Sequence, residues 1–512
     1  MRISRRQIAL AVATAAILGL TACGGGATSP GDDSAPATAP LLRIGSLQEP
    51  QSWDPGQANE GHLAPLFQSV YDTLIKRKPD GSLTPMLATE WAFSDDGLTF
   101  TLKLRDNIKF TDGETFDSDA VKANIEHFQK ANGPMGSALD AISAVETPDA
   151  VTAVLRLSAP DPSLPYVLTS AGGYMGSPDA LTADSIATMP VGSGPYQLDA
   201  SNTVTGSKIA MVRNDDYWGE RLPYDKVEFQ IMTDDTARLN ALRSGQLDAA
   251  MFNRAASAIE AENAGLHSDP YSTGWMGLLI FDREGQKIPE LADVRVREAL
   301  ALAIDTKSIL DVVEQGRGEL TSQTFGPRTT GYLNQLDSAY KYDPERARQL
   351  LKEAGTEDLT ITFPISNTFD PTIYDSILQN WEDVGIKVER HQWGPGEAMP
   401  SMLRGDFPIG LMKLNQRDSW QHIRFLGTPD APWNPYHMET PDLDKLIRIA
   451  QYGDETERDQ AAKNINQYFI DQVWFVPMYR PFNHFYWNDA VSVQNQIDQA
   501  VPSLYNYSPA GN

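Results

Sequence analysis

Histidine is the side chain that most often holds a catalytic zinc ion or moves a proton near neutral pH, so its spacing in the chain is informative. The chain has seven histidines: His62, His127, His267, His391, His422, His437 and His484. No two of them stand four residues apart, and the sequence lacks the H-E-x-x-H pattern of zinc hydrolases. We therefore expect no zinc-hydrolase site, no resident metal and no cofactor.

A glycine-rich segment at residues 192–195 (GSGP) suggests two other chemistries, phosphate binding and nucleophilic attack by a serine. A phosphate loop ends in Gly-Lys-Ser/Thr, and a serine nucleophile of the elbow type stands in G-x-S-x-G. The segment has neither pattern, and Pro195 removes a backbone N–H donor where a phosphate would need one. The sequence therefore predicts no catalytic residue and favours a protein that is not an enzyme.

The composition excludes further classes of protein. The 512 residues include 42 Lys and Arg against 68 Asp and Glu, which gives a net charge of −26. A charge of this sign opposes contact with a phosphate backbone, so we expect no nucleic-acid partner. A single cysteine excludes an internal disulfide and a thiolate-bound metal cluster. At roughly 150 residues per domain, the length suggests about three domains or a large fold of two lobes.

The single cysteine, Cys23, follows the features of an export signal. A basic start (MRISRR) precedes an apolar run at residues 8–20, which is too short to cross roughly 30 Å of hydrocarbon but suits a secretory signal. Residues 20–23 (LTAC) resemble the lipobox of bacterial lipoproteins, in which the cysteine is lipidated and becomes the first residue. We therefore expect a signal peptide at 1–22, lipidation of Cys23 and a flexible tether at 23–40, which is rich in Gly, Ser, Ala and Pro.

Two alternatives stay open at this end of the chain. Cys23 can instead be a free buried cysteine behind an ordinary signal peptide. Residues 4–8 (SRRQI) also look like a twin-arginine export signal, so the sequence leaves the export route undecided. Beyond the signal no apolar run reaches eighteen residues, and we do not expect the chain itself to be a channel or permease.

Past the tether, strand-like and helix-like patterns alternate. Alternating apolar residues predict strands at residues 41–45, at Thr99–Leu104 and at 151–157. Apolar residues at steps of three and four predict a helix at 116–129 and a longer one at 293–313. This alternation of strands and helices favours an α/β fold.

Residues 343–355 (DPERARQLLKEAG) show both ends of a helix. Asp343 suits the N-cap, Pro344 suits the first helical position, and Gly355 suits the left-handed position that follows the last turn. Strands at 359–363 and 385–389 flank a further helix around Trp381. We expect these two strands to lie side by side in one α/β unit.

Several segments, in this order, resemble the oligopeptide-, dipeptide- and nickel-binding family of extracytoplasmic solute-binding proteins of ABC importers. The matching segments include residues 80–91 (DGSLTPMLATEW), 94–105 (SDDGLTFTLKLR), 192–196 (GSGPY), 214–219 (NDDYWG), 241–248 (ALRSGQLD), 293–300 (DVRVREAL) and 476–479 (VPMY). Each segment is a weak signal alone. Their shared order behind a lipobox identifies the chain as similar to this family.

The resemblance implies an α/β fold of the type II periplasmic-binding-protein kind, with two lobes, a hinge and an extra subdomain in the first lobe. By this reading, lobe I comprises residues 41–75, 190–277 and 480–512. Its subdomain comprises residues 76–189, and lobe II comprises 278–479. The chain would cross between the lobes near 275–283 and return near 480.

The resemblance also implies a function. It predicts a lipoprotein that captures a peptide or another small polar solute outside the cell and delivers it to the permease of an ABC importer. We expect a monomer, held by the lipid on Cys23 to the outer face of the cell membrane. One alternative is a metal–chelator complex or another anionic or zwitterionic ligand bound by the same mechanism. Another is a docking or chaperone-like lipoprotein without a solute cleft.

In peptide-binding members of the family, an aspartate that follows a G-D-F/Y turn binds the peptide amine. Here that stretch is residues 405–420 (GDFPIGLMKLNQRDSW), in which Asp418 can take that role while Lys413 and Arg417 introduce cations. Because arginine holds a carboxylate with two parallel hydrogen bonds, these cations favour an anionic, zwitterionic or carboxylate-bearing ligand. The other candidate contacts are Asn415, Trp420, Trp393 and His422, with Glu60, Tyr174, Tyr271 and Trp275 in the first lobe or near the hinge.

Overall fold

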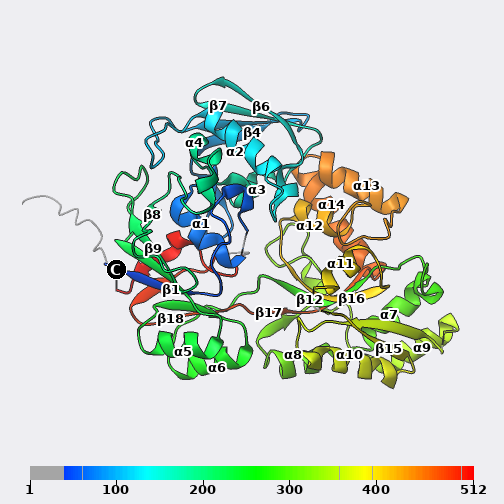
Figure 1. The fold of residues 1–512 in the computed structure, drawn as a ribbon. Coiled ribbons are helices and arrows are strands. Elements are labelled where there is room, and N and C mark those ends of the chain that lie inside the picture. Colours follow the sequence, from blue (N-terminus) through cyan, green and yellow to red (C-terminus); the bar gives the residue numbers. More distant parts are fainter. Residues whose placement is uncertain (1–39, 60, 357, 395, 497–498, 512) are drawn as a thin grey trace, which may run out of the picture. The chain divides into compact units, whose positions relative to one another are not determined.

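The computed structural model describes residues 40–59, 61–356, 358–394, 396–496 and 499–511. Helices and strands alternate along this part of the chain (Figure 1), as an α/β fold requires. The predicted signal peptide, Cys23 and Glu60 lie outside the described residues. Within them, no helix combines the length and the apolar character needed to cross a bilayer.

The first sheet has six strands in the order β18-β11-β1-β10-β9-β8. Its strands are β1 (Leu42–Ser46), β8 (Tyr196–Leu198), β9 (Lys208–Arg213), β10 (Lys226–Ile231), β11 (Ala249–Phe252) and β18 (His484–Trp487). The predicted strand at 41–45 is β1, which runs parallel to both of its neighbours. Helices α5 (Asp235–Arg243) and α6 (Ala255–Asn263) pack beside β11 and β18. We call the part of the chain built on this sheet, and sharing its core, lobe I.

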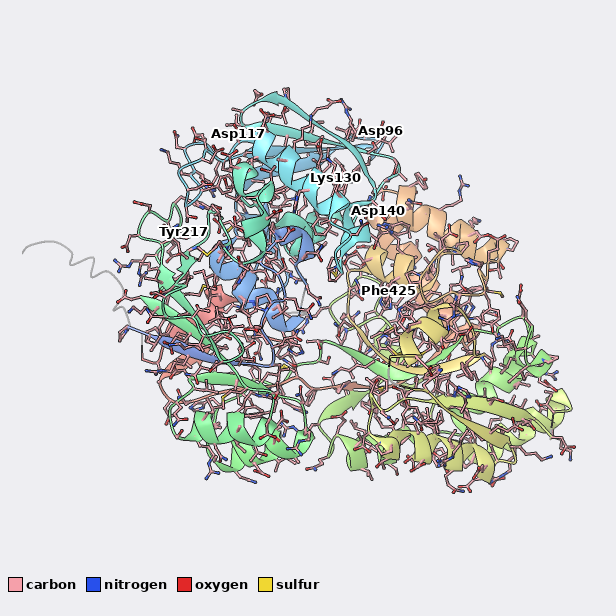
Figure 2. All side chains as sticks on the ribbon, in the orientation of Figure 1. Asp96, Asp117, Lys130, Asp140, Tyr217 and Phe425 are labelled. Atoms are coloured by element: carbon pink, nitrogen blue, oxygen red, sulfur yellow. The ribbon has the colours of Figure 1, made fainter. Side chains whose placement is uncertain are left out.

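An antiparallel sheet of four strands shares the core of lobe I. Its order is β4-β5-β7-β6, with β4 (Ala88–Phe93), β5 (Thr99–Leu104), β6 (Ile142–Asp149) and β7 (Thr152–Leu157). Helix α2 (Ser118–Lys130) packs on β6 and β7. The Asp117 carboxylate caps α2 by accepting from the Ala120 N–H at 3.0 Å, and Figure 2 labels Asp117 and Lys130 at the two ends of this helix. The predicted strands at 99–104 and 151–157 and the predicted helix at 116–129 are confirmed.

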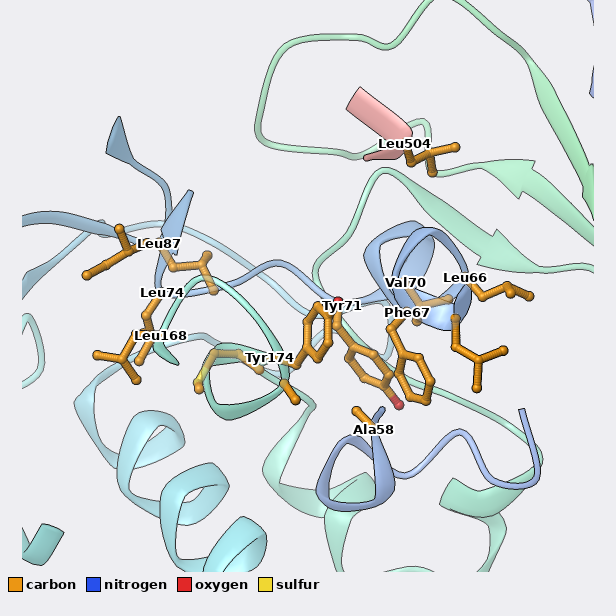
Figure 3. Packing of buried hydrophobic residues seen from close by; sticks show 14 of the residues in the cluster. Ala58, Leu66, Phe67, Val70, Tyr71, Leu74, Leu87, Leu168, Tyr174 and Leu504 are labelled. Carbon is orange, nitrogen blue, oxygen red and sulfur yellow. The ribbon is translucent and has the colours of Figure 1, made fainter. Parts of the chain in front are cut away.

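The core of lobe I contains a cluster of aromatic rings around α1 (Ala64–Val70), shown in Figure 3. The ring of Phe67 stacks on Tyr174 with 5.8 Å between centroids, and Tyr71 lies 6.2 Å from Tyr174. The Tyr71 hydroxyl donates to the carbonyl of Trp53 at 2.8 Å, so its polar end is paired inside the core.

One buried carboxylate ties together two of the segments that carry the resemblance described above. Asp72 is fully buried and accepts from Trp218 Nε1 at 2.7 Å and from the Ser193 hydroxyl at 2.9 Å. The hydroxyls of Tyr217, labelled in Figure 2, and Tyr505 each donate to it at 3.1 Å. The segments at 192–196 and 214–219 therefore have an architectural role in lobe I.

A second part of the chain, which we call lobe II, is built on a sheet with the order β13-β17-β12-β16. These strands are β12 (Gly274–Ile280), β13 (Gly318–Leu320), β16 (Ile409–Asn415) and β17 (Phe475–Pro481). Every residue of β12 and β17 is buried, so the two central strands are covered on both faces. Two apolar cores form around this sheet.

Two neighbouring stretches join the lobes. The chain leaves lobe I before β12 and returns to it between β17 and β18. Ser272 and Phe482 form an antiparallel bridge, and the Asn483 N–H donates to the Tyr271 carbonyl at 2.6 Å. The two crossing stretches therefore support each other at the hinge.

The α/β unit predicted in lobe II is confirmed. Helix α9 (Pro344–Ala354) begins after Asp343, whose carboxylate accepts from the Arg346 N–H, and ends at Gly355 with a left-handed φ of 72°. Strands β14 (Thr360–Ile365) and β15 (Lys387–Gln392) pair in parallel and flank α10 (Pro371–Asp383) in the chain.

The single long helix predicted at 293–313 is wrong. The structure has two helices there, α7 (Val294–Leu302) and α8 (Thr306–Val313). Asp305 separates them, because its side chain caps α8 by accepting from the Ser308 N–H at 3.1 Å. The Asp305 N–H is meanwhile bonded to the Asn380 side chain at 2.9 Å instead of continuing the helix.

The remaining elements are shorter or lie around the two sheets. In lobe I these are β2 (Ile75–Arg77), β3 (Leu83–Pro85), α3 (Leu164–Val167), α4 (Pro178–Leu181), β19 (Val491–Val493) and β20 (Tyr507–Pro509). In lobe II they are α11 (Ala398–Leu403), α12 (Ser419–Leu426), α13 (Pro441–Tyr452) and α14 (Glu455–Asp471).

Candidate functional site

A cavity of about 490 Å³ is lined by residues of both lobes. In lobe I its walls come from the β2–β3 turn and from the segment around α3. In lobe II they come from the loop at 328–330, the end of β16, the start of α12 and the facing parts of α13 and α14. Among the described residues, its charged lining consists of Arg77, Arg328, Arg417, Arg458, Asp80, Asp418, Glu455 and Asp459. The cavity thus combines four cations with four carboxyl groups.

Asp418 stands at the start of α12, where one carboxylate oxygen accepts from the backbone N–H of Trp420 at 3.0 Å and of Gln421 at 3.3 Å. Its other oxygen, Oδ2, is buried and has no hydrogen-bond partner among the described residues. Burial raises the pKa of Asp418 to about 7, and the negative charge of Asp161 adds to the increase. Near neutral pH this carboxyl can therefore offer a solute either an acceptor or a donor.

Trp420 contributes a buried donor to the same wall. Its side chain lines the cavity but is only 5% exposed, and its indole N–H has no partner among the described residues. A buried donor without a partner costs free energy, which an acceptor on a bound solute would recover. Trp420 is thus a residue of the cavity wall that carries a buried donor without a partner in the described part of the chain.

Two arginines give this wall a positive character. The guanidinium of Arg417 lies over the ring of Phe425, labelled in Figure 2, at 4.1 Å from its centroid. Arg328 is exposed, and no ion pair is found for it within the described residues. An exposed cation without a carboxylate partner is available to an anionic group of a solute.

The wall from lobe I adds negative charge and hydroxyl groups. The hydroxyl and backbone N–H of Ser82 donate to Asp80 at 2.7 and 2.9 Å and hold the pKa of this carboxyl below its usual range. Asp80 is therefore ionised at neutral pH. Tyr166 and Ser170 line the cavity from α3 and the segment that follows it. A solute in this cavity meets both charges and hydroxyls.

Residues 82–432 match the family model described as bacterial extracellular solute-binding proteins, family 5, middle part. The match spans more than half of the chain. The chain belongs to this family. Family 5 proteins capture solutes outside the cytoplasm for ABC importers, so this chain is a transport protein and not an enzyme.

Curated relatives of this family 5 protein include binding proteins for several solutes. The nickel-binding periplasmic protein of Escherichia coli K12 is 28% identical over 451 residues, which cover 80% of this chain and 83% of that protein. The glutathione-binding protein GsiB of Salmonella paratyphi A is 31% identical over 344 residues, 65% of this chain and 66% of that protein. The relatives therefore differ in the solute that they are named for.

Solved structures establish the two-lobed α/β fold. HbpA2 from Haemophilus parasuis superposes with a TM-score of 0.81 at 22% identity, covering 92% of this chain and 99% of that chain. NikA from Brucella suis, solved in complex with Fe(III)-EDTA, superposes with a TM-score of 0.79 at 20% identity, covering 92% of this chain and 100% of that chain. The predicted fold class, a periplasmic-binding-protein-like α/β fold, is confirmed.

Four of the predicted contact residues of this family 5 protein lie together at the cavity. The cavity is lined by Asn415, Arg417, Asp418 and Trp420, which are close in sequence. Lys413 lies two residues before Asn415 on β16 and is exposed, but it is not part of the lining. Glu60 lies outside the described residues, beside Gly61, which does line the cavity.

Several other predicted contacts pack inside the protein. Trp393 is 4% exposed and meets the edge of Phe407 at 5.3 Å, and Trp275 is fully buried against Phe475. The Tyr271 hydroxyl donates to the Gln499 carbonyl at 2.5 Å beside the hinge. Together with Tyr174 in the aromatic cluster of lobe I, these residues are not part of the cavity lining.

His422 lies on α12 but points into the core of lobe II. Its ring is 1% exposed and packs edge-on against Phe325 at 4.6 Å. Burial lowers the pKa of His422 to about 3, so the ring is neutral at physiological pH. No cluster of three potential metal ligands of the His, Cys, Asp or Glu type occurs in the described part of the chain.

Several charged residues of the cavity were not predicted from the sequence. Arg77 is the last residue of β2, and Asp80 lies in the β2–β3 turn, in a segment that supported only the family resemblance. Arg328 follows a Gly-Pro pair, and Arg458 lies in the first turns of α14. The only sequence signal for them was a charge in or near a loop, which is too common to mark a site.

Proposed function

We propose that this family 5 protein binds a small polar solute in the cavity between its lobes and passes it to the permease of an ABC importer. The observation that carries the proposal is a cavity of about 490 Å³ lined from both lobes by charged and hydrogen-bonding side chains. Its volume falls in the range of about 300–1,000 Å³ that is typical of small-molecule sites. We propose Asn415, Arg417, Asp418 and Trp420 as ligand contacts in lobe II.

The charges favour a solute that carries both an acidic and a basic or polar group. Four arginines and four carboxyl groups line the described part of the cavity, so neither a purely cationic nor an apolar solute would satisfy it. Guanidinium groups suit carboxylates, and Asp80 on the opposite wall suits an ammonium group. A peptide or another zwitterion fits this pattern, and a metal–chelator complex with free carboxylates is the second candidate.

Titration of the purified protein tests this proposal. Short peptides, small dicarboxylates and metal–chelator complexes are added while tryptophan fluorescence is followed, and calorimetry gives the stoichiometry. We expect saturable 1:1 binding of at least one class and weaker binding after Arg328→Gln. Arg243→Gln on α5 is the matched control, because Arg243 is also exposed and does not line the cavity. A folded protein that binds none of these solutes would favour the docking or chaperone-like alternative.

We also propose that the chain is exported, lipidated at Cys23 and monomeric. The basic start, the short apolar run and the LTAC segment at 20–23 support lipidation. Metabolic labelling with a radioactive fatty acid should mark the wild-type protein and leave Cys23→Ser unlabelled. Light scattering of the detergent-solubilised protein should give the mass of one chain.

A further inference from the structure

A direct ion pair joins the two lobes beside the cavity. Arg424 on α12 of lobe II donates from Nη1 to Oδ2 of Asp161 in lobe I at 2.8 Å. Next to this pair, the side chain of Gln451 on α13 donates to the carbonyl of Pro160 at 3.1 Å. We propose that Arg424 and Asp161 form a latch that holds the lobes together around the cavity.

The lobe I half of the latch is held by contacts within lobe I. The Asp161 side chain is 2% exposed. Its Oδ1 accepts from the hydroxyl and the backbone N–H of Ser163, at 2.5 and 3.1 Å, within lobe I. Oδ2 receives its only described bond from Arg424 across the lobe boundary. A charge-assisted bond to such an ordered carboxylate loses little entropy when it forms, which makes it an effective closing contact.

The same segments that carry the latch also line the cavity. On α12, Trp420 lines the cavity one turn before Arg424. On the opposite side, Pro162 lines the cavity directly after Asp161, and Tyr166 lines it from α3. A solute that touches both walls therefore holds in place the two segments that the latch joins. Arg424 acts on binding through the position of α12 and has no need to touch the solute.

This inference rests on the proposed function, but its test needs no knowledge of the solute. Spin labels at Lys122→Cys on α2 and Lys445→Cys on α13 would report the distance between the lobes by electron–electron double resonance. Both lysines are exposed. The full chain is used as purified, with Cys23→Ser so that only the two introduced thiols react. Arg424→Gln removes the charge and leaves a side chain of moderate length.

The control for Arg424→Gln is Arg390→Gln. Arg390 makes an ion pair of 2.7 Å with Asp375, but both partners lie within lobe II. We expect Arg424→Gln to raise the ratio of long to short distances about tenfold, with an unchanged melting temperature, and Arg390→Gln to leave it unchanged. Equal distance distributions for Arg424→Gln and wild type would overturn the proposal.

A second measurement covers the case in which Arg424→Gln does not fold. The Arg424 side chain is 38% exposed, so dissolved salt can screen its attraction to Asp161. Raising sodium chloride from 50 to 500 mM should shift the wild-type distances toward the longer population. Distances that do not respond to salt would contradict a latch built on this ion pair, whatever the solute proves to be.

Discussion

The Asp72 carboxylate offers a direct test of how lobe I is stabilised. It accepts four hydrogen bonds, from Trp218, Ser193, Tyr217 and Tyr505, in the fully buried core. Asp72→Asn keeps the shape of the side chain but exchanges one oxygen for an NH₂ group. The amide oxygen can face the indole N–H, which can only donate, while the tyrosine hydroxyls can turn to accept from the NH₂ group. We therefore expect the variant to fold.

The informative quantity is how the stability difference between Asp72→Asn and wild type changes with pH. Burial raises the pKa of Asp72 from 3.8 to about 6 in the folded protein. Because the folded state then binds the proton more tightly than the unfolded state, the free energy of unfolding falls as pH rises from about 4 to about 6. A shift of about two pKa units corresponds to about 3 kcal/mol. Asparagine does not titrate, so the free energy of unfolding of the wild type should fall by about 3 kcal/mol relative to that of Asp72→Asn over this pH range.

Urea unfolding of both proteins at pH 4 and pH 7, followed by tryptophan fluorescence, measures this difference. Asp95→Asn, which changes an exposed aspartate, is measured alongside as the control for the substitution itself. If the difference between wild type and Asp72→Asn is the same at both pH values within about 1 kcal/mol, the reasoning about the buried carboxylate is refuted.

Three further changes test other parts of the account. Gly355→Ala should lower the free energy of unfolding, measured in urea, by about 1 kcal/mol. The φ of 72° at Gly355 disfavours a residue with a Cβ, although no atom lies within 4 Å of where that Cβ would be. Arg480→Ala should lower the free energy of unfolding by about 3 kcal/mol or more in the same assay, since the buried guanidinium of Arg480 donates to Asp337 at 2.9 Å. The free energy of unfolding of His422→Phe, relative to that of the wild type, should rise by about 2 kcal/mol when the pH is lowered from 7 to 5. The folded pKa of about 3 makes wild-type stability fall as pH drops below about 6.5, and parallel pH curves would contradict this.

Local signals explain why much of the fold could be predicted from the sequence. A cap, a turn or an alternation acts within one element, as at Asp343 and Gly355 around α9 and along β5. The prediction of one helix at 293–313 failed because apolar residues keep a helical spacing across the break. Asp305 separates the two helices because its side chain accepts from the Ser308 N–H and caps α8. The spacing of apolar residues gives no sign of such a cap.

The candidate site was harder to predict because its residues meet only through the tertiary fold. Arg77 and Arg458 line one cavity although they lie in different lobes. Trp420 and Trp393 were both predicted to contact the solute, yet one lines the cavity and the other packs against Phe407. Which tryptophan faces the solute depends on the direction of each element in the folded protein, and periodicity within one segment does not contain that information.

Native mass spectrometry of the protein purified from its own cells tests the central claim most directly. We predict that the wild-type protein carries a small polar molecule in a 1:1 complex. Trp420→Ala should lose this molecule, because it removes a buried donor from the cavity wall. Trp393→Ala should keep it, since Trp393 does not line the cavity. A folded wild-type protein without any such molecule, or a molecule retained equally by Trp420→Ala, would contradict the account.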